Sequence, residues 1–132
     1  MTGPSSPLGD NNPGDLAPPA CTIGHHRIGQ VTVVAVTGTV DMLTAPQLAA
    51  AIRAAAGDNN AAAIVIDLTE VEFLASAGMG VLAAAKDELT PDVRFVLVAD
   101  GPATSRPLQL VGISEIVELF ATLDQALAAV AT

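Results

Sequence analysis

The residues of this chain that could take part in chemistry gather in one stretch, between Asp67 and Leu82. The stretch reads Asp-Leu-Thr-Glu-Val-Glu-Phe-Leu-Ala-Ser-Ala-Gly-Met-Gly-Val-Leu. It joins a run of apolar residues to a helical pattern, and Ser76 lies where the N-cap of that helix is expected, a position that serine favours. The small residues Ala77 and Gly78 keep the first turn narrow, so that another surface can approach closely. Ser76 is therefore either a structural cap or the centre of a contact surface.

No other set of residues has the spacing of a catalytic or metal-binding site. His25 and His26 are the only histidines, and neighbours on a strand point to opposite faces, which argues against a shared metal ion. We interpret Asp67, Glu70 and Glu72 as the polar end of a strand and an exposed loop rather than as paired catalytic carboxylates. The sequence contains no nucleophile elbow, phosphate-binding loop or dinucleotide fingerprint. We therefore expect no enzymatic activity, no cofactor and no metal.

Composition limits the size and the class of the protein. The chain has 132 residues, a formal net charge of −9 and one cysteine, Cys21. This length suits one ordinary domain. The acidic balance argues against a nucleic-acid-binding protein, which needs a basic surface. A single cysteine allows no intramolecular disulfide, and the sequence shows neither a signal peptide nor a membrane span, so we expect a cytoplasmic protein.

The chain divides into a tail and a domain. Residues 1–20 are rich in Pro, Gly, Ser and Asn, which predicts a flexible tail, whereas residues 21–132 predict a folded domain. In that domain, hydrophobic patterning predicts strands at 23–28, 31–36, 61–68, 93–99 and 116–120, and helices at 44–56, 76–89, 105–111 and from 122 onward. The order β-β-α-β-α-β-α-β-α predicts a single α/β domain, in which about four helices pack on a mixed, mostly parallel sheet of about five strands.

Several signals locate the ends of these elements. Thr44 is expected to cap the first helix, and Thr122 begins a capping box for the last one. The buried strand at 61–68 is expected to end near Asp67. The loop that follows is expected to turn Phe73 and Leu74 back into the core.

The stretch from Asp67 to Leu82 resembles the signature of STAS domains, and specifically that of the anti-sigma-factor antagonists. In that family the helix start commonly reads Asp-Ser-Ser-Gly or Asp-Ser-x-Gly. The matching serine is phosphorylated by a partner that is both an anti-sigma factor and a kinase, and Ser76 occupies its position. Here Ala75 replaces the usual Asp and Ala77 replaces the second serine, so Ser76 is the only hydroxyl at this helix start.

A second segment supports this resemblance. Gly38-Thr-Val-Asp41, followed by Leu43-Thr-Ala, is similar to the Gly-x-hydrophobic-Asp loop that follows the second strand in the family. The resemblance implies that this loop lies near the phosphorylated serine and that Asp41 contacts the partner. A role for Asp41 as an ordinary loop or helix-start residue stays open. In element order, the resemblance extends over residues 22–130.

The resemblance implies an interaction protein, an anti-sigma-factor antagonist. Such a protein binds an anti-sigma factor that is also a serine kinase, releases a sigma factor, and is switched off by phosphorylation at Ser76. It binds no nucleic acid and does not insert into membranes. The surface that meets the partner is expected to comprise Asp41, Thr44, Ala75, Ser76, Ala77, Gly78 and Met79. The alternatives are a STAS module of a stressosome-like or lipid-transport assembly, and a STAS domain that senses a small ligand or a nucleotide.

Overall fold

The computed structural model describes residues 21–57 and 61–131, so the predicted flexible tail at 1–20 lies outside the described residues. The elements in chain order are β1 (Cys21–Ile28), β2 (Val31–Val40), α1 (Ala45–Ala56), β3 (Ala63–Leu74), α2 (Ser76–Leu89), β4 (Arg94–Val98), α3 (Ser105–Leu110), the 3₁₀ helix η2 (Ile113–Glu115), β5 (Glu118–Phe120) and α4 (Leu123–Val130). The predicted order of strands and α-helices is confirmed. The short helix η2 was not predicted.

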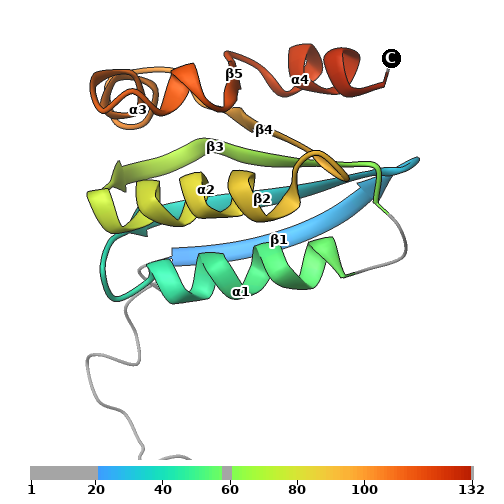
Figure 1. The fold of residues 1–132 in the computed structure, drawn as a ribbon. Helices are drawn as coiled ribbons and strands as arrows, with labels where there is room; N and C mark the ends of the chain where they lie inside the picture. Colours follow the sequence, from blue (N-terminus) through green and yellow to red (C-terminus); the bar gives the residue numbers. More distant parts are fainter. Residues whose placement is uncertain (1–20, 58–60, 132) are drawn as a thin grey trace, which may run out of the picture.

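The strands form one five-stranded sheet in the order β1-β2-β3-β4-β5. β1 and β2 pair as an antiparallel hairpin, and every later pair is parallel. α1 and α2 lie side by side against one face of this sheet (Figure 1), and α4 packs against the other. The predicted mixed, mostly parallel sheet is therefore confirmed. None of the helices in the described ranges is long and apolar enough to span a membrane.

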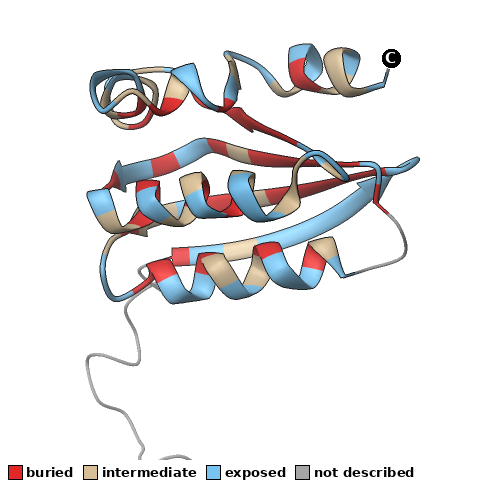
Figure 2. Ribbon diagram, viewed as in Figure 1, coloured by how far each residue is buried: buried red, intermediate tan, exposed pale blue. Residues whose placement is uncertain are grey.

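Two apolar clusters hold the layers together. Because alternate residues of a strand point to opposite faces, β2 contributes Val34 and Val36 to the cluster under α1 and α2. Its residues Val31 and Val33 join the cluster under α4. Figure 2 shows buried residues along the central strands, whereas β1 is mostly exposed. Burial on both faces explains why the central strands are continuous apolar runs.

β3 is longer than the sequence predicted. The strand does not end near Asp67 but continues to Leu74, which pairs with Val40 at the end of β2. The pairing of β3 with β2 shifts register twice. The buried residues in the second half of β3 are therefore three apart rather than two, and this spacing does not look like that of a strand. Leu74 is buried as predicted. The prediction for Phe73 is wrong, because its side chain is 55% exposed.

The capping prediction for α4 is confirmed. The Thr122 hydroxyl accepts a hydrogen bond from the backbone N–H of Gln125 at 3.1 Å. The side-chain oxygen of Gln125 accepts in turn from the backbone N–H of Ala121 at 3.3 Å. The first bond satisfies a backbone donor that a helix start leaves free. The second differs from a capping box, in which the Gln125 side chain would bond to the N–H of Thr122.

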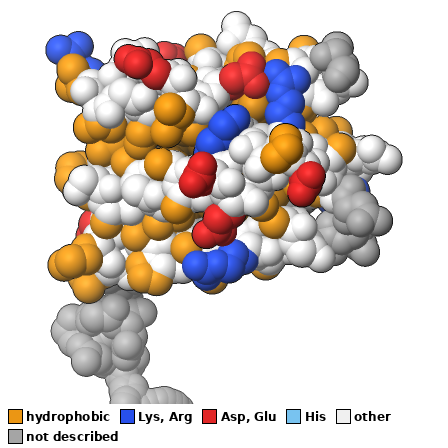
Figure 3. All heavy atoms as spheres, in the orientation of Figure 1, with side chains coloured by type: hydrophobic (Ala, Val, Ile, Leu, Met, Phe, Trp, Pro, Cys, Tyr) orange, Lys and Arg blue, Asp and Glu red, His pale blue; other side chains and the backbone are white. Residues whose placement is uncertain are grey.

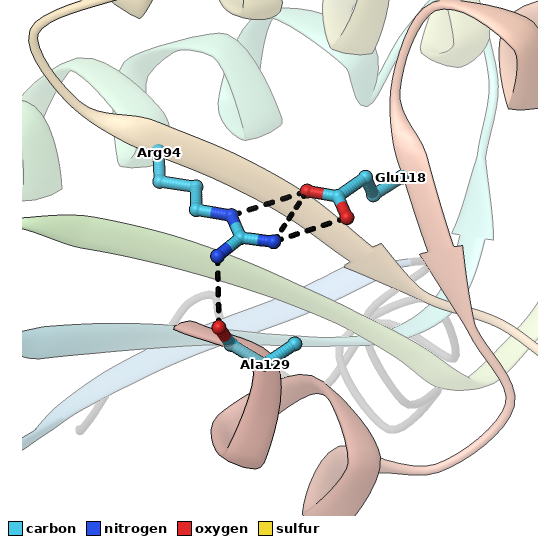
Figure 4. A network of polar contacts seen from close by, with 3 residues as sticks. All are labelled: Arg94, Glu118 and Ala129. Carbon is cyan, nitrogen blue, oxygen red and sulfur yellow. Dashed lines mark hydrogen bonds and ion pairs between the residues drawn. The ribbon is translucent and has the colours of Figure 1, made fainter. Parts of the chain in front are cut away.

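A network centred on Arg94 fastens α4 to the edge of the sheet and links β4 to β5 (Figure 4). Arg94 Nε donates to Glu118 Oε1 at 3.1 Å, and Nη2 donates to Oε1 at 2.8 Å and to Oε2 at 3.0 Å. Nη1 donates to the backbone carbonyl of Ala129, near the end of α4, at 2.8 Å. One guanidinium group therefore joins β4, β5 and the negative end of a helix dipole.

We expect Arg94→Ala to lower the free energy of unfolding by about 1 kcal/mol, because exposed ion pairs and helix-end charges each contribute a fraction of that amount. Arg94→Lys keeps the charge but not the two-pronged geometry, so it should recover only part of the loss. Urea denaturation measures both effects. Equal stability of Arg94→Ala and the wild type would show that the network contributes nothing.

Candidate functional site

Two chain segments meet at the end of the sheet where α1 and α2 begin (Figure 1). Because β2 and β3 are parallel, their final residues Val40 and Leu74 are partners in the sheet. The backbone N–H of Ala75 then donates to the carbonyl of Val40 at 2.8 Å. This bond holds the segment 41–44 beside the start of α2, which carries Ser76.

Ser76 is the first residue of α2 and is not its N-cap. Ala75 occupies the N-cap position with extended backbone (φ −85°, ψ 169°), and its carbonyl accepts the first helical bond from Met79. No side chain caps this helix, and Ser76 is exposed. The prediction that Ser76 serves as the cap is therefore wrong. Its hydroxyl instead lies at the positive end of the helix dipole, among backbone N–H groups that no side chain satisfies.

Gly78 has a packing role rather than the predicted role of admitting another surface. It is buried, and a Cβ atom added there would lie 2.5 Å from Val40 Cγ1 and 2.9 Å from Leu74 Cδ1. Met79 is only 7% exposed and belongs to the core. The bare backbone of Gly78 therefore allows the first turn of α2 to sit directly on the ends of β2 and β3.

The carboxylate of Asp41 stabilises the loop at residues 41–44 by accepting hydrogen bonds from its backbone. Oδ1 accepts from the backbone N–H of Leu43 at 2.9 Å and from the backbone N–H of Thr44 at 3.2 Å. Among the described residues, none donates to Oδ2. One carboxylate oxygen thus has a structural role, and the other is left for a further contact.

Thr44 precedes α1, but its hydroxyl does not cap the helix as predicted. Thr44 Oγ1 accepts from the backbone N–H of Asp41 at 2.9 Å and lies 2.9 Å from the carbonyl of Thr39, to which it donates. The side chain is buried under the loop. The hydroxyl does not cap α1 because it is used in these two bonds to the loop and to the end of β2.

The predicted contact residues therefore divide by burial. Ser76 is exposed and Asp41, Ala75 and Ala77 are partly exposed, whereas the buried ones are Thr44, Gly78 and Met79. In this conformation a docking protein can touch the first four residues and cannot reach the three buried ones.

Three exposed apolar side chains lie at the same end of the sheet as Ser76. The sequence did not predict that any of the three would be on the surface. Met42 and Leu43 are 77% and 84% exposed, and Phe73 pairs with Thr39 at the end of β3. Figure 3 shows apolar side chains gathered at this end of the molecule. Grouped exposed apolar residues mark interaction sites. The sequence signal for this patch is the apolar pair Met42-Leu43 in a short loop, where polar residues are usual.

The remaining candidates for chemistry offer none. Burial, and secondly the nearby Asp41 carboxylate, raise the pKa of the Cys21 thiol above its ordinary value, so the thiol stays protonated and unreactive at neutral pH. His25 and His26 are both exposed on β1. Within residues 21–57 and 61–131, no three His, Cys, Asp or Glu side chains are grouped as metal ligands would be.

Comparison with known proteins gives a consistent result. The model of the STAS domain family matches residues 23–126. The chain is 40% identical over 114 residues to the anti-sigma-F factor antagonist RsfB of Mycobacterium tuberculosis H37Rv, covering 86% of this chain and 93% of that protein.

Solved structures agree with that match. An anti-sigma factor antagonist from Mycobacterium paratuberculosis is 45% identical, with a TM-score of 0.83 over 88% of this chain and 98% of the other. The anti-sigma factor antagonist SpoIIAA, in its unphosphorylated form, shares the fold at 20% identity, with a TM-score of 0.69 over 83% of this chain and 96% of the other.

Proposed function

The chain belongs to the STAS domain family, and from this membership we propose that it is an anti-sigma-factor antagonist. It binds an anti-sigma factor in the cytoplasm and thereby releases a sigma factor. The main support for the proposal is the exposed Ser76 in the first turn of α2, a helix that no side chain caps. It stands in a chain that is 40% identical to an anti-sigma-F factor antagonist over most of its length.

The partner surface consists of two kinds of side chain. Met42, Leu43 and Phe73 supply apolar area that is lost from water on binding, the usual source of affinity at the centre of an interface. Asp41 and Ser76 supply polar groups between them. A protein surface of matching shape satisfies both requirements, whereas no enclosed pocket is needed.

Phosphorylation of Ser76 is the switch. The anti-sigma factor acts as the kinase and holds ATP. The serine oxygen attacks the γ-phosphorus and gives up its proton to a base of the kinase, the bond to the β-phosphate oxygen breaks, and ADP leaves. The chain itself is the substrate in this step, so it needs no catalytic residue, cofactor or metal and is not an enzyme.

Asp41 provides a test of which part of the loop meets the partner. Asp41→Ala removes the Oδ1 acceptor, so we expect the free energy of unfolding to fall by about 1 kcal/mol, as for the loss of a helix cap. Asp41→Asn retains an acceptor oxygen and should unfold near the wild-type midpoint, while the lost charge weakens binding and slows phosphorylation of Ser76. If Asp41→Asn matches the wild type in affinity and phosphorylation rate, Asp41 has a structural role only.

The direct experiment is a calorimetric titration of the wild-type chain with purified anti-sigma-F factor from Mycobacterium tuberculosis. We expect saturable binding. With ATP and Mg²⁺ added, we expect mass spectrometry to locate one new phosphoryl group on Ser76. Absence of binding at micromolar concentrations, or modification at other residues only, would contradict the proposed function.

A further inference from the structure

A groove on the surface between α1 and α2 adjoins the surface around Ser76 and shares Ala77 with it. Its volume is about 310 Å³, and Figure 3 shows apolar side chains between the two helices. It begins one residue after Ser76 and follows α2 toward its C-terminal end. The lining residues are Ala49, Ile52, Arg53, Ala77, Gly80, Val81, Ala84, Ala85 and Glu88.

Gly80 in the wall of this groove is not required by the fold. It is exposed, and a Cβ atom added there would meet no atom within 4 Å, in contrast to the tightly packed Gly78. A glycine inside a helix costs about 1 kcal/mol relative to alanine. Ser76, Gly80 and Ala84 are four residues apart, so they share one face of α2. The chain thus keeps a strip of bare backbone beside Ser76 at a cost in stability, which is typical of a surface that another backbone approaches.

The shape of the groove suits an α-helix. The lining residues of α2 run from Ala77 to Glu88, and the groove extends over about 16 Å at the rise of an α-helix. Gly80 and Ala84 are exposed, so the groove is open to solvent along this part of α2. Small ligands instead prefer sites that bury most of their surface. An amphipathic helix lies in such a groove through apolar side chains spaced along one face.

Charges at the rim specify the occupant further. Arg53 on α1 and Glu88 on α2 both line the groove and are exposed. Neither forms an ion pair with another described residue. An occupant that carries an acidic group near Arg53 and a basic group near Glu88 would satisfy both charges.

We propose that the α1–α2 groove seats an amphipathic α-helix of the anti-sigma factor, the same protein that contacts Ser76. This inference rests on the proposed function. The helix places its small apolar face on Gly80 and Ala84, with acidic and basic side chains toward Arg53 and Glu88. A phosphoryl group on Ser76 would then stand beside the end of the occupied groove, where the partner must remain in contact with α2.

A matched pair of substitutions tests the groove. Ala84→Leu places an isobutyl group in it, and Ala54→Leu places the same group on the part of α1 outside it. Both alanines are exposed helix residues, and leucine is a good helix former, so both variants should fold as the wild type does. We expect Ala84→Leu to weaken the affinity for Mycobacterium tuberculosis anti-sigma-F factor by about 10- to 100-fold, and Ala54→Leu by less than about twofold.

The outcomes separate this inference from the function on which it rests. If the wild type does not bind the anti-sigma-F factor, the proposed function fails and the inference fails with it. If the wild type binds, Ser76→Asp does not, and Ala84→Leu binds normally, the groove inference is wrong and the function stands. Equal weakening by Ala84→Leu and Ala54→Leu also contradicts the groove. So does sedimentation that shows a wild-type dimer which Ala84→Leu dissociates without loss of affinity, because the occupant is then a second copy.

Discussion

Replacing Ser76 by Asp is expected to weaken the affinity for the anti-sigma factor at least ~100-fold, while the chain unfolds at the same denaturant concentration or slightly above it. Phosphorylation should act in the same direction and more strongly, because a phosphoserine carries about −1.5 to −2 charges and three acceptor oxygens at neutral pH. The loss arises at the interface, where a strongly hydrated anion would occupy a surface that the partner has to cover.

The fold itself should tolerate the new charge. Ser76 is exposed in the first turn of α2, and no side chain caps that helix. Free backbone N–H groups and the positive end of the helix dipole therefore face an acid at this position, an arrangement that typically stabilises by about 0.3–1 kcal/mol. The switch is thus predicted to change affinity without unfolding the domain.

Ser76→Ala is the control for this prediction. Because Ala75 and not Ser76 is the N-cap, we expect the free energy of unfolding to stay within about 0.5 kcal/mol of the wild type. This variant should bind the anti-sigma factor and resist the kinase. Affinity is measured by calorimetry beside urea denaturation of all three proteins. Wild-type affinity of Ser76→Asp, or a loss of binding that follows from unfolding, would reject the interface switch.

The second large effect concerns the two glycines of α2. Gly78→Ala is expected to lower the free energy of unfolding by about 2 kcal/mol, since overpacking costs up to about 3 kcal/mol and the gain in helix propensity returns about 1. The new methyl group would press on Val40 and Leu74, whose own positions are set by the ends of β2 and β3.

Gly80→Ala is the same chemical change two residues further along the same helix. The added Cβ meets no atom within 4 Å, so the substitution causes no overpacking. The higher helix propensity of alanine should therefore raise the free energy of unfolding by about 0.5–1 kcal/mol. The two variants should therefore shift the urea midpoint in opposite directions. A Gly78→Ala variant as stable as the wild type would show that α2 can move away from Val40 at little cost.

The sequence predicted the order of elements well because that order depends on local patterning. Buried strand segments such as 63–66 are continuous apolar runs, and the helices between the strands carry apolar residues at helical spacing. The second half of β3 was missed for a physical reason. Its pairing with the extension of β2 is irregular, so Leu68, Val71 and Leu74 are buried at a spacing of three, which differs from the period of a regular strand.

The candidate site was predicted in its position and not in its details. The resemblance located Ser76 and the Asp41 loop, but the start of α2 depends on the bond from Ala75 to Val40, which only the tertiary structure reveals. The exposure of Phe73 follows from the register of β3. The different roles of Gly78 and Gly80 depend on what lies above each Cα atom, and that neighbourhood is not encoded in local sequence.

We propose that this chain releases a sigma factor by binding its anti-sigma factor through the Ser76 surface. The most direct measurement is displacement of fluorescently labelled sigma factor from a preformed complex with Mycobacterium tuberculosis anti-sigma-F factor, followed by fluorescence anisotropy. We expect the wild type and Ser76→Ala to release the sigma factor in proportion to their concentration, and Ser76→Asp to release none. Retention of the sigma factor at a saturating concentration of the wild-type chain, or equal release by Ser76→Asp, would contradict it.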